Sequence, residues 1–240
     1  MRSLRLGAAL LAASALALAT ELPSYQVRLT AARDGSARAT ATVLVGHCPA
    51  GLLVLPLGFS APEDLKLEEA PPGTRLELGA RDTVSTLRFQ LPTALDAPVA
   101  LRFSFRVKQP LQALKTAPGE KGALPAGSRL FRHGFVNTQE TPIGVYRLEF
   151  LFPEGLIAQA VREQLPKLEK QETGPRVLLS VLDGQQAATL TYANVHQGDA
   201  TSMAVELVPR QRSLGWLLAG VILAGLYLFH FRDLVARKAT

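Results

Sequence analysis

The chain has 240 residues, with 26 lysine and arginine residues against 20 aspartate and glutamate residues, and a formal net charge of +6. Five of the basic residues and one acidic residue lie in the first 19 and the last nine positions, which leaves 21 basic against 19 acidic residues between them. This near-neutral region has no lysine or arginine cluster, which argues against nucleic acid as a partner. The single cysteine, Cys48, excludes an intramolecular disulfide, so we expect the hydrophobic core alone to hold the fold.

The N-terminal segment has the pattern of a secretory signal peptide. Arg2 and Arg5 precede an apolar run of alanine and leucine that ends in Ala17-Leu18-Ala19. We predict a signal peptide over residues 1–19, cleaved after Ala19. The alternative is an uncleaved anchor, but the apolar run from Leu6 to Ala19 is shorter than the ~20 residues that a spanning helix needs.

Residues 20–108 predict a first β domain. In residues 99–107, apolar side chains at every second position share one face, while Arg102, Ser104 and Arg106 share the other. Asp34-Gly35 predicts a hairpin turn between two such runs. The predicted strands are 25–30, 37–45, 52–57, 65–69, 74–78, 84–91 and 99–107. Short strands at this spacing are typical of an antiparallel β-sandwich of immunoglobulin-like size.

A proline- and glycine-rich stretch at 109–128 predicts a linker or long loop, followed by a second β domain at 129–209. Within residues 155–165, apolar residues at helical spacing predict one short helix, which Pro166 would end. The predicted strands of this domain are 130–136, 145–152, 176–182, 187–192 and 202–208. The predicted fold class is therefore all-β, with one large or two sandwiches.

The stretch Leu214–Phe231 contains no charged residue and predicts a single C-terminal transmembrane helix, because its length suits the hydrocarbon core of a bilayer. Trp216 and Tyr227 suit the two membrane interfaces, and Arg232 opens a cytoplasmic tail at 232–240. Small residues four positions apart within the run would let a partner span approach closely, although such pairs are common in alanine-rich spans. We expect the domain before the run to be exported.

The most polar stretch, residues 132–144, supplies the candidate site. His133, Asn137, Gln139 and Glu140 could form a binding loop held by rigid strands. His133 with Glu140 could also act as an acid and base. The alternative is a structural hairpin loop whose asparagine and threonine satisfy their own backbone.

The neighbouring residues His47 and Cys48 could offer two ligands to zinc or copper, but structural metal sites need about four ligands at set spacing. We therefore expect no metal site and no cofactor. Cys48 is more simply a small buried thiol in a turn, with an intermolecular disulfide as the alternative.

The common motifs of hydrolases, phosphate-binding loops and thiol redox enzymes are absent from the sequence. The absence of asparagine glycosylation sequons and the alanine, leucine and arginine content favour a bacterial envelope protein. The leading hypothesis is a single-pass inner-membrane protein whose exported part is a non-enzymatic binding or scaffolding module. Its partners would be the lipid bilayer and another membrane protein, met through the span or the exported domain. The alternatives are an envelope hydrolase that combines the 132–144 loop with His196 or Asp199, and a surface adhesin.

Overall fold

A computed structural model describes residues 20–32, 34–81, 84–114, 124–164, 175–210, 220–227 and 231. The chain separates into two compact units, one ending at Val208 and one beginning at Pro209. The described part of the first unit is built of strands. They are β1 (Leu22–Ala31), β2 (Ala37–Val45), β3 (Gly51–Pro56), β4 (Glu63–Glu69), β5 (Arg75–Arg81), β6 (Val84–Leu91), β7 (Val99–Val107), β8 (Leu111–Ala113), β9 (Arg129–Val136), β10 (Ile143–Leu151), β11 (Leu156–Gln164), β12 (Arg176–Leu182), β13 (Gln185–Val195) and β14 (Ala200–Pro209).

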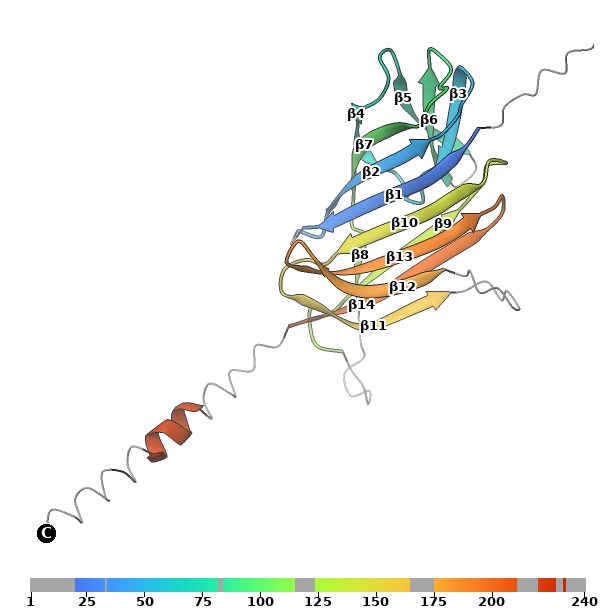
Figure 1. Ribbon diagram of the computed structural model, residues 1–240. Helices are drawn as coiled ribbons and strands as arrows, with labels where there is room; N and C mark the ends of the chain where they lie inside the picture. Colours follow the sequence, from blue (N-terminus) through green and yellow to red (C-terminus); the bar gives the residue numbers. More distant parts are fainter. Residues whose placement is uncertain are drawn as a thin grey trace, which may run out of the picture. The chain divides into compact units, whose positions relative to one another are not determined.

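The largest sheet has seven strands in the order β12-β13-β10-β1-β2-β7-β4 (Figure 1). β1 lies at its middle and pairs antiparallel with β2, from Ser24 opposite Leu44 to Ala31 opposite Ala37. On its other side β1 pairs parallel with β10. The sheet thus joins the N-terminal and C-terminal halves of the β region.

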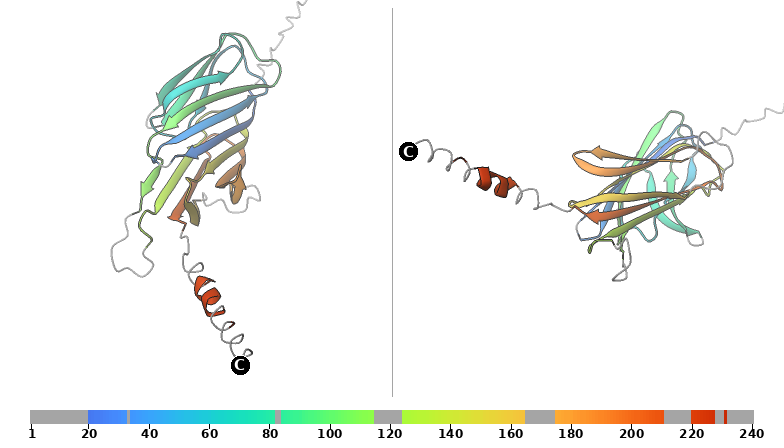
Figure 2. Two further views of the ribbon diagram at one scale, coloured as in Figure 1. Left: turned by 90° about the vertical axis from the view of Figure 1, so that its left-hand side faces the viewer. Right: turned by 90° about the horizontal axis from the view of Figure 1, so that it is seen from below.

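Two smaller sheets cover one face of the seven-stranded sheet (Figure 2). One has the order β11-β14-β9-β8, and the other has the order β3-β6-β5. Aromatic pairs mark both contacts: Phe131 of β9 stacks on Phe150 of β10 with ring centroids 3.8 Å apart, and Phe89 of β6 meets Phe103 of β7 edge-on. The core therefore lies between the large sheet and the two small ones, and strands of all three sheets contribute to it.

The strands form here because their sequences alternate. In β1, Tyr25, Val27 and Leu29 are buried, while Gln26 and Arg28 between them are exposed. Period-two alternation puts every apolar side chain on the core face of the sheet and every polar one on the other face. The all-β prediction is confirmed, and the predicted strands 37–45, 84–91, 99–107 and 176–182 coincide with β2, β6, β7 and β12.

The predicted helix at 155–165 is wrong, because residues 156–164 form the strand β11. β11 lies at the edge of the four-stranded sheet, and Leu156, Ile157 and Val161 are all only partly buried. An edge strand with half-buried side chains on both faces shows no period-two pattern, so the helical spacing of its apolar residues was misleading. The β-branched Ile157 and Val161 favour a strand, and a helix of this length has little stability of its own.

The pairing also differs from an all-antiparallel sandwich. β1 and β10 are parallel over the register from Leu22–Ile143 to Thr30–Leu151. β8 lies inside the predicted linker 109–128, and the seven-stranded sheet takes strands from both sides of that stretch. Three sheets rather than two form the described β region, and its strands up to Val208 fall in one compact unit. Alternation within a strand carries no information about its neighbour or its direction, which is why the sequence could not show this arrangement.

The predicted signal peptide, 1–19, and the predicted tail, 232–240, lie outside the described residues. So does most of the predicted span, where the structure describes a helix over 220–227 and residue 231. Its apolar side chains are exposed, and Tyr227 packs against Phe231 with ring centroids 6.1 Å apart. Within the described part of the chain, none of the helices has the length and apolar character to cross a bilayer.

Candidate functional site

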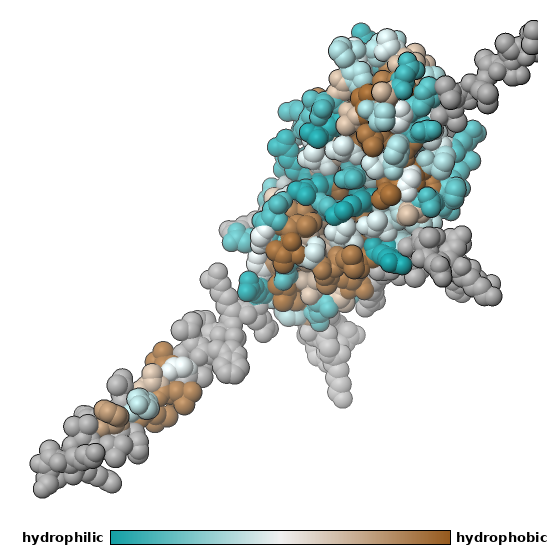
Figure 3. Space-filling view, viewed as in Figure 1, coloured by the Kyte–Doolittle hydropathy of each residue, from teal (hydrophilic) through white to brown (hydrophobic). Residues whose placement is uncertain are grey.

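The open face of the seven-stranded sheet, opposite the core, is mostly polar over β1, β2, β7 and β4, with apolar patches toward its β12 end (Figure 3). The strand register aligns these residues in rows across the sheet. One row runs from Arg28 on β1 through Thr40 on β2 and Ser104 on β7 to Lys66 on β4. The next row runs from Thr30 through Arg38 to Arg106 and Glu63.

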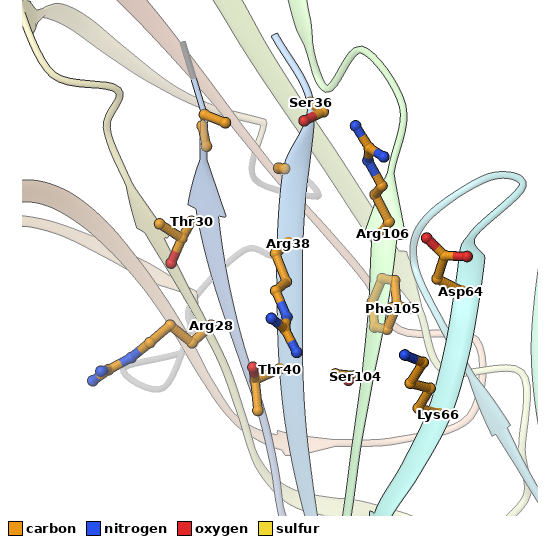
Figure 4. Close-up of a pocket in the computed structure, with 13 residues that line it drawn as sticks. Arg28, Thr30, Ser36, Arg38, Thr40, Asp64, Lys66, Ser104, Phe105 and Arg106 are labelled. Atoms are coloured by element: carbon orange, nitrogen blue, oxygen red, sulfur yellow. The ribbon is translucent and has the colours of Figure 1, made fainter. Parts of the chain in front are cut away.

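These two rows border a hollow of about 620 Å³ on the open face (Figure 4). Four strands contribute to it: β1, β2, β7 and β4. Its charged lining residues are Arg28, Arg38, Lys66, Arg106 and Asp64. Its hydroxyl-bearing lining residues are Thr30, Ser36, Thr40 and Ser104. Four cations against one carboxylate give the hollow a positive charge.

Most cations of this face are paired with carboxylates. Arg28 donates to Glu149 at 2.8 Å and to Asp183 at 2.9 Å, and Arg147 reaches Glu149 at 2.7 Å. The other pairs are Arg102 with Glu69 at 3.2 Å, Arg106 with Asp34 at 3.7 Å, and Lys108 with Glu63. Hydrogen bonds from the Ser36 hydroxyl and amide to Asp34 lower the pKa of that carboxyl, which keeps it charged beside Arg106.

Arg38 and Lys66 differ from these cations. Among the residues that the structure describes, neither has a carboxylate within ion-pair distance or a side-chain hydrogen bond. Both side chains are exposed and both line the hollow. Arg38 is also directly opposite Arg106 across the β2–β7 pair. Like charges at opposite positions of an antiparallel pair destabilise a sheet, so this arrangement is not explained by stability.

A second, smaller hollow of about 310 Å³ is apolar and lies at the edge of the β region. Phe152, Ile157, Leu179 and Val181 line it, together with Ala158, Ser180, Gln186 and Ala187. Leu179 and Val181 belong to β12, the edge strand of the large sheet, and Ile157 belongs to β11. The two sheets thus leave part of their apolar interior open at this edge.

No protein-family model and no curated protein matches the sequence. Among solved structures, the chain is similar to an M1 zinc metallopeptidase from Deinococcus radiodurans, at 17% identity and a TM-score of 0.40, covering 78% of this chain and 42% of that one. It is also similar to leukotriene A4 hydrolase from Saccharomyces cerevisiae, at 10% identity and a TM-score of 0.47, covering 78% of this chain and 29% of that one. The chain therefore spans less than half the length of either structure, and likeness at this level carries no conclusion about its activity.

The predicted site residue His133 lies in the core rather than on the surface. It is 4% exposed, its ring packs on Phe59 with centroids 4.7 Å apart, and its Nε2 shares a 2.8 Å hydrogen bond with the Tyr146 hydroxyl. Burial lowers the pKa of His133 to about 3, so the ring is neutral at ordinary pH. Its position could have been read from the sequence, because residues 131, 133 and 135 alternate inward along one strand.

Asn137 is also buried, and it joins two loops. Its side-chain amide donates to the backbone carbonyls of Thr141 and Val195, while its side-chain oxygen accepts from the Gln139 amide. Its backbone amide donates to Asp199, and its carbonyl accepts from Gly198. Each polar group of this side chain therefore has a structural partner, as in the hairpin-loop alternative.

The two other predicted residues of this loop stay nearer the surface. The Gln139 side chain donates to Thr138, and Glu140 is exposed. The hydrolase hypothesis needs His133 to meet His196 or Asp199. In the described region no interaction links His133 to either residue. His196 is exposed, and its backbone amide donates to the Asp199 carboxylate. The structure thus does not bring the predicted site residues together on one surface.

Cys48 is buried and carries a free thiol, in a bridge opposite Leu95. Burial raises its pKa, and the Thr20 hydroxyl contacts its sulfur at 3.8 Å. Among the described residues, no group of histidine, cysteine and carboxylate side chains is arranged to hold a metal ion. Of the predicted membrane-interface residues, Trp216 and Arg232 lie outside the described residues, and Tyr227 is 69% exposed.

The sequence reasoning missed the hollow on the open face. A signal was present in β7, where Arg102, Ser104 and Arg106 were correctly placed on one face. The partners Arg38 and Lys66 come from β2 and β4, and only the register shows that these side chains face the same space.

Proposed function

We propose that this protein is a membrane-anchored, non-enzymatic binding module of a bacterial envelope, and that it binds its ligand or partner on the open face of the seven-stranded sheet. The observation that carries this proposal is the hollow where Arg38 and Lys66 stand without carboxylate partners, although the neighbouring cations of the face are paired. Unpaired cations in a hollow are available to a ligand, whereas paired ones must first give up an interaction.

The anchor is proposed from the sequence. The run Leu214–Phe231 has no charged residue, and its described part is helical and apolar. Together with the proposed signal peptide, it would hold the chain in the inner membrane as a single-pass protein, with the β region exported and the tail cytoplasmic. A module in that position suits an accessory subunit of a membrane assembly.

Site-specific cross-linking in intact membranes tests this function. A photoreactive amino acid replaces Thr40, which lines the hollow, and in a matched control it replaces Gln90, an exposed residue of β6 in another sheet. We expect a defined adduct from position 40 and none from position 90. The function is refuted if position 40 yields no adduct and the gently extracted protein is a monomer without any co-purifying component.

A further inference from the structure

We propose that the hollow binds a phosphate group between Arg38 and Lys66. This inference rests on the proposed binding function and names the chemistry of the ligand. The site uses two cations from two different strands, β2 and β4, with Ser104 of β7 between these strands and the Thr40 hydroxyl next to Arg38 along β2.

The geometry gathers donors at one level of the sheet. Ser104 is directly opposite Thr40 on one side and Lys66 on the other. The guanidinium of Arg38 extends along β2 toward Thr40, and the ammonium of Lys66 lies on the other side of Ser104 (Figure 4). Ser104 is only 3% exposed and lies at the floor of the hollow, whereas Thr40 is half-buried. An anion above this row would therefore meet charged donors from two sides and the Thr40 hydroxyl from the sheet.

Charge supports an anion at this place. The hollow holds four cations against Asp64, and Figure 4 shows that Asp64 lies toward Arg106 rather than beside Arg38. Arg28 and Arg106 are engaged by carboxylates outside the hollow, so Arg38 and Lys66 supply the uncompensated charge. A bound anion would also offset the repulsion between Arg38 and Arg106, which face each other across β2 and β7.

The donor set favours phosphate over carboxylate. A carboxylate is planar and one arginine can satisfy it through two parallel hydrogen bonds. A phosphate group presents three or four oxygens in a tetrahedral arrangement, which suits donors that converge from several directions. The hollow is also larger than a phosphate ion, and Ala31, Ala37 and Phe105 contribute to its lining. It thus has room for the body of a molecule that carries the phosphate, either a soluble phosphate ester or a phospholipid headgroup.

Binding measurements on the full chain in phosphate-free maltoside micelles test this inference. One titration uses inorganic phosphate, and a second uses mixed micelles that contain phosphatidylglycerol. We expect saturable binding in at least one of them, weakened about tenfold or more by Arg38→Gln and by Lys66→Gln, because each variant removes a charge-assisted hydrogen bond. Binding in the first titration identifies a soluble phosphate, and binding only in the second identifies a lipid headgroup.

Arg102→Gln is the matched control. Arg102 lies on the same face, is paired with Glu69 and does not line the hollow, so its replacement should leave phosphate binding unchanged. Thermal unfolding shows whether each variant is folded, and Arg38→Gln should be no less stable than the wild type, because it removes a like-charge pair.

Three results overturn the inference. The first is the absence of binding in both titrations, and the second is binding that Arg38→Gln and Lys66→Gln leave unchanged. The third is displacement of the bound anion by acetate as effectively as by sulfate, which would show a site for carboxylates. In each case a cross-linked adduct at position 40 would still support the binding function, so the two proposals fail separately.

Discussion

The Nε2 atom of His133 lies 2.8 Å from the hydroxyl oxygen of Tyr146, inside the core between the large sheet and the four-stranded sheet. Tyr146 stacks on Phe135 with ring centroids 3.8 Å apart, and Tyr25 meets Tyr146 edge-on. His133, which the sequence placed in a candidate binding loop, is thus part of a buried aromatic cluster. Its other ring nitrogen, Nδ1, has no hydrogen-bond partner among the described residues.

Burial of His133 predicts a stability that depends on pH. Its pKa of about 3 in the folded protein is below the unfolded value near 6.5, so between these values the unfolded chain binds the additional proton. The free energy of unfolding should therefore be highest above pH 6.5 and fall toward pH 3, by up to about 1.4 kcal/mol for each pH unit from this group.

Denaturation of the full chain at a series of pH values checks this dependence. The double variant His133→Leu/Tyr146→Phe removes the titrating ring and its hydrogen-bond partner together, so it leaves no orphaned partner. Its stability should change less with pH than that of the wild type. Equal pH dependence in the two proteins would show that His133 does not carry the effect.

Two tyrosines in this cluster predict opposite responses to removal of the hydroxyl group. Tyr146→Phe leaves the His133 Nε2 atom buried without a partner, which should cost about 1–3 kcal/mol. The Tyr25 hydroxyl is buried and has no partner in the described region, so Tyr25→Phe should be neutral or stabilising. Unfolding free energies from chemical denaturation measure both. If both variants lost the same stability, the hydrogen bond would not be the cause.

Asn137 should matter to stability more than its loop neighbours do. Asn137→Ala removes hydrogen bonds to Thr141, Val195 and Gln139, and we expect a loss of about 1–3 kcal/mol. Glu140→Ala, at an exposed position of the same loop, should stay within about 0.5 kcal/mol of the wild type. If Glu140→Ala kept its stability but abolished the cross-linked adduct at position 40, this loop would be part of the binding site.

Gly144 of β10 lies against the backbone of Pro23 in β1. A Cβ atom at this position would come within 2.6 Å of the Pro23 carbonyl oxygen, which is backbone and has little freedom to move. We expect Gly144→Ala to destabilise the sheet by about 1–3 kcal/mol. Gly134 in β9 is the matched control, because a Cβ atom there has no neighbour within 4 Å, and Gly134→Ala should stabilise the strand by about 0.5–1 kcal/mol. Equal effects of the two substitutions would argue against close packing at Gly144.

Local patterns predicted the bounds of β2, β6 and β7, where one face is buried and the other is open, and also those of β12, which is largely exposed on both faces. The turn at Asp34-Gly35 joins β1 to β2. The same reasoning failed at β11, which has partly buried side chains on both faces, and at β8, which has only three residues. The prediction of a binding loop at 132–144 took polar residues as surface residues. His133 and Asn137 are instead buried and make hydrogen bonds inside the protein.

The sequence by itself determined that the chain is rich in strands, which face of most strands is polar, and that the run Leu214–Phe231 is free of charge. These properties depend on residues that are neighbours along the chain. Only the tertiary structure decided that β1 pairs with β10, that His133 is buried, and that Arg38 and Lys66 share one hollow. These depend on which strands become neighbours and in which register, and side chains from β2, β7 and β4 meet only after that pairing is made.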